Sequence, residues 1–91
     1  RTSSNRGTTA PAASGPTSVI FTVPGDGSIK CGDGTSKDAP GGKARVTFRS
    51  VPADGITCTY YDGRTPVCAG FVNPGNRKCA CNPDAAEIAC E

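Results

Sequence analysis

Two stretches of the chain alternate strictly between apolar and polar residues. In residues 43–49, Ala44, Val46 and Phe48 alternate with Arg and Thr, and residues 56–61 repeat the pattern with Ile, Cys and Tyr. A period of two turns one face of a β-strand toward a core and the other toward solvent. The pattern therefore predicts two strands, with the cysteine of the second strand on its inner face.

Three further strands are predicted from short runs rich in β-branched and aromatic residues, at 18–23, 28–31 and 67–72. Residues 32–42 are polar, with four Gly and no large apolar side chain, and predict a loop. Short strands separated by Gly- and Pro-rich turns are typical of an all-β sandwich or barrel. We expect a small antiparallel β fold of this kind, stapled by disulfides.

The C-terminal segment favours a short helix. Asn82-Pro83-Asp84 offers an N-cap residue, a proline at the first helical position and an acid in the first turn. Residues 85–90 would then form about two helical turns, with Ile88 facing inward. Residues 77–81 before this helix are expected to form an edge strand.

Six cysteines in a chain without histidine predict three disulfides and an oxidising compartment. Zinc sites bring cysteines in pairs about two to four residues apart, and no such pairs occur, so disulfides are favoured over a metal site or free thiols. Cys79 and Cys81 point the same way on a strand and would not bond each other. A Cys81–Cys90 bond closing a small terminal loop is one of many pairings that the sequence leaves open. The six are Cys31, Cys58, Cys68, Cys79, Cys81 and Cys90.

Residues 1–16 differ in composition from the rest of the chain. They consist of small and polar residues with two Arg and no large apolar side chain, which predicts a flexible arm before a cysteine-stabilised β domain at 17–91. Two arginines are too few for a polyanion-binding arm, so a solvated or O-glycosylated leader is favoured. The chain begins with Arg rather than Met, as expected of a mature secreted protein whose signal peptide has been removed, and we expect a secreted, extracellular protein.

The composition argues against most catalytic and metal sites. Without histidine the chain lacks Ser-His-Asp and Cys-His catalytic sets, and it has no GxSxG, P-loop or GxGxxG motif. Asp26, Asp33 and Asp38 lie in a Gly-rich stretch without EF-hand spacing, which favours turn aspartates over a calcium site. We expect no enzymatic activity, metal or cofactor. Apolar runs of at most three residues predict no membrane insertion.

The candidate binding residues surround a predicted turn at Asp62-Gly63. Tyr61, with Asp62 as a polar partner, is a candidate stacking platform for a carbohydrate. Arg64 lies four residues before a cysteine, and a basic side chain on a constrained loop would suit a trypsin-like protease pocket. Arg45 and Arg49 share one strand face, but residues 17–91 carry eight basic and eight acidic residues, so nucleic-acid binding is not expected.

The size, the Ser/Thr/Ala-rich leader, the six cysteines and the Gly/Pro-turned β core resemble small secreted cysteine-rich proteins of filamentous fungi. That group includes apoplastic effectors of plant pathogens and antifungal proteins. Residues 78–81 and 89–91 are similar to the end of the antifungal β-barrel proteins, which are strongly Lys-rich, whereas residues 17–91 here are neutral. The resemblance implies a virulence effector that binds a host extracellular protein or cell-wall polymer. Protease inhibition through Arg64 and antifungal activity are the alternatives, and we expect a monomer.

Overall fold

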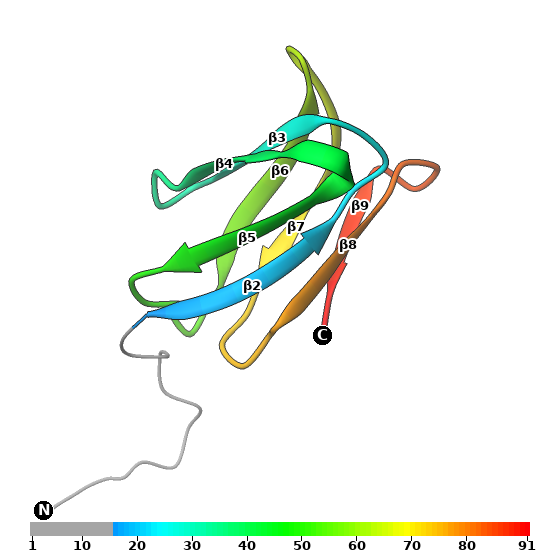
Figure 1. The fold of residues 1–91 in the computed structure, drawn as a ribbon. Helices are drawn as coiled ribbons and strands as arrows, with labels where there is room; N and C mark the ends of the chain where they lie inside the picture. The colour runs from blue at the N-terminus through cyan, green and yellow to red at the C-terminus, as the bar shows by residue number, and fades with distance from the viewer. Residues whose placement is uncertain (1–15) are drawn as a thin grey trace, which may run out of the picture.

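Eight β-strands form one sheet that curves into a nearly closed barrel in the computed structural model, which describes residues 16–91 (Figure 1). The predicted all-β, disulfide-stapled fold is confirmed. A single turn of 3-10 helix, η1, lies at Pro40–Gly42. The strands are β2 (Thr17–Thr22), β3 (Gly27–Cys31), β4 (Ser36–Ala39), β5 (Lys43–Phe48), β6 (Ile56–Asp62), β7 (Thr65–Val72), β8 (Lys78–Asn82) and β9 (Glu87–Cys90).

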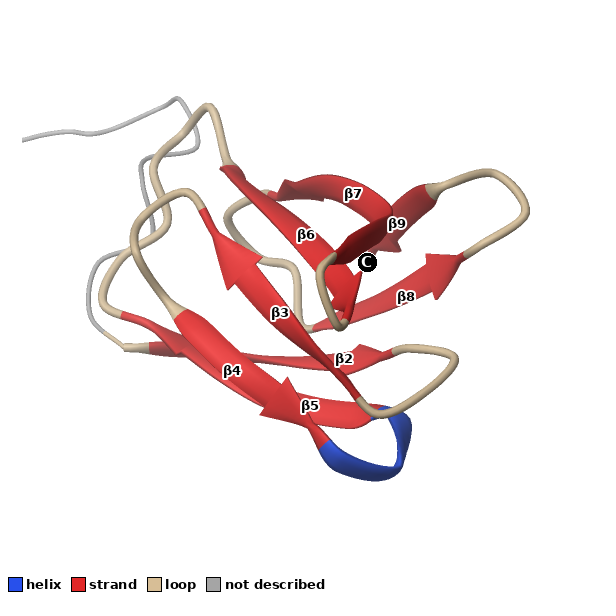
Figure 2. Ribbon diagram, turned by 90° about the horizontal axis from the view of Figure 1, so that it is seen from above, coloured by secondary structure: helices blue, strands red, loops and turns tan. Residues whose placement is uncertain are grey.

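The strand order is β4-β3-β6-β7-β9-β8-β2-β5. The two strands at its ends, β4 and β5, are joined by η1 and lie next to each other, which brings the edges of the sheet together (Figure 2). All neighbouring strands are antiparallel except at two places. β2 pairs in parallel with β8 over three residue pairs, and β7 pairs in parallel with β9 through Ala69↔Glu87 alone. The hairpin of β8 and β9 is therefore held on both sides by short parallel contacts.

The barrel interior is filled by the apolar positions of the alternating strands. Ala44, Val46 and Phe48 are buried, as the pattern at 43–49 predicts. The largest fully buried side chains are Tyr60, Phe21, Phe48 and Ile29. Burial of a large apolar side chain is worth about 1.5–3 kcal/mol, so each of these residues makes a substantial contribution to the stability of the barrel.

The three predicted disulfides are present, and no cysteine is free. Cys31–Cys58 joins β3 to β6 and Cys79–Cys90 joins β8 to β9, each between residues directly opposite in an antiparallel ladder. Cys68–Cys81 links β7 to β8 across the intervening β9. The suggested Cys81–Cys90 pairing is wrong, because the β8–β9 register places Ile88 opposite Cys81.

The predicted C-terminal helix is also wrong, because the chain turns back and forms β9. The Asp84 backbone N–H donates a hydrogen bond to Asn82 Oδ1 at 3.1 Å, the kind of local bond that an N-cap residue makes. Here the bond belongs to a turn, in which Ala86 adopts a φ of 54°. Ile88 is buried as expected. β8 is an interior strand rather than the predicted edge, since β9 and β2 flank it.

The polar segment at 32–42 is not entirely a loop. It contains β4, which pairs antiparallel with β3 and buries only Ala39 among its four residues. A strand with one buried residue lacks the apolar alternation that would predict it. Of the expected flexible arm at 1–16, residues 1–15 lie outside the described part of the chain.

Burial of Tyr60 predicts an alkaline loss of stability. The pKa of Tyr60 is raised above 10.0 mainly by burial and then by the nearby charge of Asp62, with Asp26 adding to it and a hydrogen bond at Gly25 opposing it. Below pH 10 this residue leaves stability unchanged. As the pH rises from 10 toward the raised value, the unfolded chain ionises first and the free energy of unfolding falls. Denaturant titrations at pH 8 to 11 should show a smaller decline in Tyr60→Phe, and identical declines in both proteins would contradict this assignment.

Candidate interaction surface

The tip of the β6–β7 hairpin carries two of the three predicted binding residues. Asp62 pairs with Thr65, so the turn consists of Gly63 and Arg64. Gly63 has a φ of 66°, the positive value that a type II′ hairpin requires at its first central position. Asp62 and Arg64 are exposed, and the hairpin projects from one end of the barrel (Figure 1). The turn therefore presents one acidic and one basic side chain at fixed positions.

Tyr61 lies just before this turn on the outer side of β6, while its neighbour Tyr60 points into the core. The Tyr61 side chain is half-buried, and the Lys30 ammonium on β3 lies 5.4 Å from its ring centroid. A cation at this distance from an aromatic ring is attracted to the ring face. The contact orients the Tyr61 ring on the barrel surface.

Phe71 is an aromatic residue on this surface that the sequence analysis did not single out. It is 59% exposed, and it is the one large hydrophobic side chain that residues 16–91 leave exposed. The sequence contains a signal for this position. Cys68 and Val72 are four residues apart and so share one face of a strand, and both are buried on β7, so alternation places Phe71 on the outer face. Its partner across the sheet is Thr57 on β6.

Tyr61 and Phe71 lie at the two ends of one outer face. The pairs between them hold small side chains, such as Thr59↔Ala69, and the two ends are four residues apart along β6, about 13 Å. We call this surface the β6–β7 outer face. It comprises Thr57, Thr59, Tyr61, Pro66, Ala69 and Phe71.

The turn geometry bears on the protease-inhibitor alternative. An inhibitor that mimics a substrate presents its side chain from an extended segment that can lie in the protease cleft. Arg64 occupies a two-residue turn, and the flanking residues Asp62 and Thr65 are held in the β-ladder. The exposed basic side chain fits the alternative, but the backbone around it does not support it.

Two of the three aspartates considered for calcium accept backbone hydrogen bonds in loops, whereas Asp38 lies in strand β4 and not in the expected turn. Asp26 Oδ1 accepts a hydrogen bond from the Gly41 N–H at 2.6 Å, and Asp33 Oδ1 accepts one from the Thr35 N–H at 2.9 Å. Within residues 16–91 no three His, Cys, Asp or Glu side chains come close enough to share a metal ion. The same part of the chain holds no helix with the length and apolarity needed to span a membrane.

Comparison of the chain with protein-family models, with curated proteins and with solved structures finds no match. No activity is therefore transferred from a relative.

Proposed function

We propose that this protein is a secreted, non-enzymatic interaction protein that acts like a fungal effector and binds a host extracellular protein or cell-wall polymer. Binding would take place on the β6–β7 outer face and the adjoining turn with Asp62 and Arg64. The observation that carries the proposal is the exposure of Phe71 on the same face as Tyr61. Aromatic side chains are enriched at protein interfaces and also stack on sugar rings, so this face suits either class of partner.

The strands that carry this face are braced by disulfides. Cys58 on β6 is bonded to β3, and Cys68 on β7 is bonded to β8. A surface held in its binding conformation loses less conformational entropy when a partner binds. Disulfides also persist mainly in oxidising compartments, which supports the extracellular part of the proposal.

Removal of the two exposed aromatic rings tests the proposal. We expect Tyr61→Ala and Phe71→Ala each to weaken binding by about tenfold, the effect of losing an interface aromatic worth more than about 1 kcal/mol. Binding would be measured to fractionated apoplastic proteins and to isolated neutral cell-wall polysaccharides. Thr22→Ala, an exposed change on β2, is the control and should bind normally.

A leaf assay tests the effector role. On infiltration, the oxidised protein should cause cell death or a defence response in the leaf, and the reduced and alkylated protein should cause neither. The variant that lacks both rings should cause only a weak response. Unchanged activity in a folded Tyr61→Ala/Phe71→Ala protein would overturn the choice of surface. If no form of the protein causes a leaf response, the protease-inhibitor and antifungal alternatives are favoured.

A further inference from the structure

The basic residues of the described part of the chain are clustered, although its positive and negative charges sum to zero. Residues 16–91 contain eight basic and eight acidic residues. Five of the basic residues lie on one side of the barrel, on or beside β5, β2 and β8, and all five are exposed. We call this surface the basic face. It comprises Lys43, Arg45, Arg49, Arg77 and Lys78, with Ile20 at its centre.

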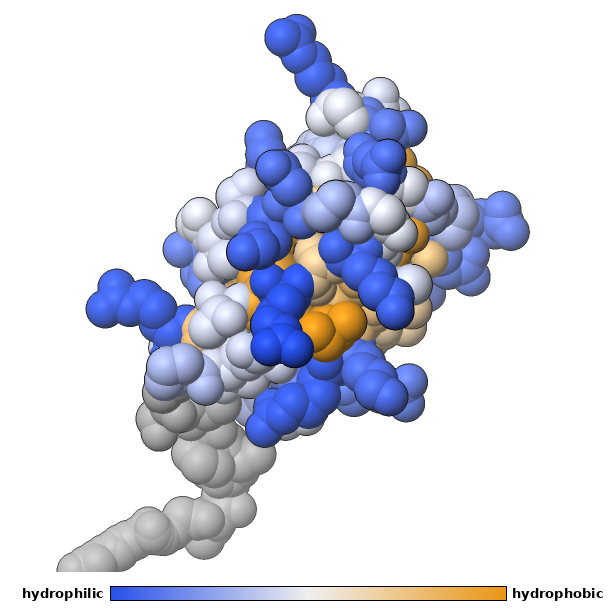
Figure 3. All heavy atoms as spheres, viewed as in Figure 1, coloured by the Kyte–Doolittle hydropathy of each residue, from blue (hydrophilic) through white to orange (hydrophobic). Residues whose placement is uncertain are grey.

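The register of the strands places Ile20 between two cations. Ile20 pairs with Arg45 on β5 and with Lys78 on β8. Neighbouring strands lie about 4.8 Å apart, so the two cations rise from backbones about 10 Å apart. Ile20 is half-buried and lines a shallow depression together with Arg45, Arg77 and Lys78. Figure 3 shows this side of the barrel, with a small hydrophobic area surrounded by hydrophilic side chains.

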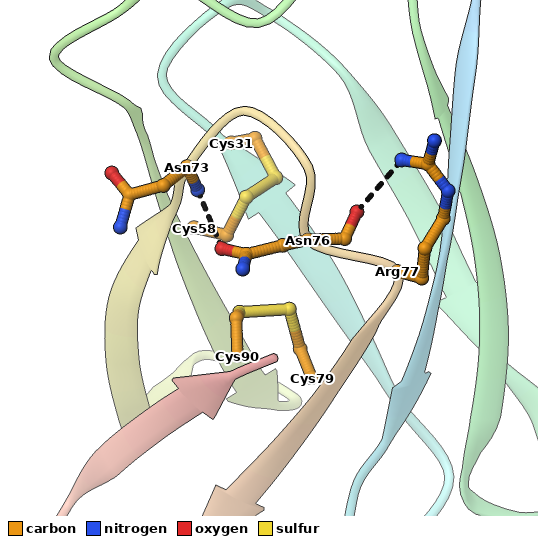
Figure 4. Close-up of a disulfide and its surroundings, with 7 residues drawn as sticks. All are labelled: Cys31, Cys58, Asn73, Asn76, Arg77, Cys79 and Cys90. Atoms are coloured by element: carbon orange, nitrogen blue, oxygen red, sulfur yellow. Dashed lines mark hydrogen bonds between the residues drawn. A yellow bond between two sulfur atoms is a disulfide. The ribbon is translucent and has the colours of Figure 1, made fainter. Parts of the chain in front are cut away.

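Arg77 is held in place at the edge of this depression. Its backbone carbonyl accepts a hydrogen bond from the Ile20 N–H at 2.9 Å, and its Nη1 donates to the Asn76 carbonyl at 3.2 Å. The Asn76 side chain accepts a hydrogen bond from the Asn73 N–H at 2.7 Å, which fixes the loop (Figure 4). The Arg77 backbone is therefore anchored to β2, and its guanidinium group bonds to the neighbouring loop.

The acidic residue Glu91 borders the basic face. Glu91 and Lys78 exchange two backbone hydrogen bonds, N–H to carbonyl at 2.8 and 3.1 Å, and so lie directly opposite each other. Opposite residues of an antiparallel pair project to the same side of the sheet, so the Glu91 carboxylate faces the outer surface beside Lys78. It would compete with an anionic ligand for this lysine.

We propose that the basic face binds an acidic polysaccharide, that is, a chain of sugar rings bearing carboxylate or sulfate groups. Ile20 offers an apolar floor for the C–H face of a sugar ring, and Arg45 and Lys78 offer cations on both sides of it. Single-stranded nucleic acid is disfavoured because its binding relies on stacking aromatics, and Tyr61 and Phe71 lie on the other side of the barrel. A membrane surface is disfavoured because this face has no exposed large apolar side chain to insert.

This inference goes beyond the proposed function, because it assigns a second surface and a ligand of defined charge. The probes are polygalacturonate for carboxylates and heparin for sulfates, with neutral dextran as the control polymer. The protein should bind at least one of the two acidic polymers at low ionic strength, and binding should weaken as salt is added, because exposed charges are screened. Tyr61→Ala/Phe71→Ala should bind the acidic polymers normally, so that failure of one proposal leaves the other testable.

Matched charge reversals locate the binding surface. Arg45→Glu should weaken binding of the acidic polymer by tenfold or more, whereas Lys37→Glu, the same charge change at an exposed position on β4, should weaken it by less than threefold. Glu91→Gln should strengthen binding. Equal losses in the two reversals would overturn the proposal, and so would stronger binding to phosphatidylserine vesicles or to single-stranded DNA than to both polysaccharides.

Discussion

Replacement of Cys68 and Cys81 together by alanine should destabilise the protein more than removal of either other disulfide. Cys31–Cys58 and Cys79–Cys90 each join strands that an antiparallel ladder already holds together. Cys68–Cys81 instead spans β9 and joins β7 to β8, beside a parallel contact that consists of one residue pair. Its loss would leave the β8–β9 hairpin attached to β7 by very few bonds.

Loop length alone predicts a different order. In the chain-entropy account, the 27-residue separation of Cys31 and Cys58 is worth about 3.5 kcal/mol and the 13-residue separation of Cys68 and Cys81 about 3 kcal/mol. We expect the native contacts that depend on Cys68–Cys81 to raise its contribution to about 4 kcal/mol or more, near the upper end for single disulfides. A loss of this size is a large fraction of the stability of a small domain.

Denaturant unfolding of the three paired Cys→Ala variants measures this order directly. Hydrogen exchange adds a local test, because the Ala69 N–H, which donates to the Ala86 carbonyl at 3.3 Å, should lose protection first in Cys68→Ala/Cys81→Ala. The two remaining variants serve as controls for the loss of a disulfide as such. A greater loss in Cys31→Ala/Cys58→Ala would show that loop length, rather than the β7–β9 contact, sets the contribution.

The strands that could be predicted are those with one face in the core. Residues 43–49 and 56–61 alternate because the barrel interior selects every second side chain, and both strands are found. β4 was not predicted because only Ala39 of its four residues is buried. This strand is defined by its hydrogen bonds to β3 and has no alternating apolar pattern.

The C-terminus was mispredicted because two structures begin with the same local bond. Asn82 can accept a hydrogen bond from the second residue after it in a helix N-cap and in an Asx turn, and Asn82-Pro83-Asp84 suits both. The choice is made by long-range contacts, since the returning strand bonds Cys90 to Cys79 and buries Ile88 in the core. Contacts between residues far apart in the sequence do not show in the local pattern. For the same reason the disulfide pairing could not be predicted from the sequence.

The candidate surfaces were predictable in part. Tyr61, Asp62 and Arg64 are adjacent in the sequence, so a turn was sufficient to bring them together. The partnership of Tyr61 with Phe71 depends on the β6–β7 register, and the basic face depends on β8 lying beside β2. The parallel contact joins strands almost sixty residues apart, and the local sequence pattern does not predict it. The sequence therefore could not show that Arg45 and Arg49 lie on the same surface as Arg77 and Lys78.

Gly70→Ala should destabilise the protein by about 2–3 kcal/mol, the cost of forcing extra volume into a tightly packed site. A Cβ at this position would collide with the Ile88 carbonyl oxygen and would lie 3.0 Å from the Ile88 Cβ. Gly70 has no left-handed φ, so its role is to provide space. The absence of a side chain is what allows β9 to approach β7 closely enough for their single pair to form.

Gly32→Ala is the matched control for this substitution. Gly32 also lacks a positive φ, and its added Cβ would meet only the Thr57 carbonyl oxygen at 3.7 Å, an ordinary contact. Reduced freedom of the unfolded chain should leave Gly32→Ala neutral or more stable by up to about 1 kcal/mol. Thermal and denaturant unfolding of the two variants therefore separate lost space from the general effect of replacing glycine. If Gly70→Ala were as stable as Gly32→Ala, close approach of β7 and β9 could not be what holds the C-terminal hairpin in the barrel.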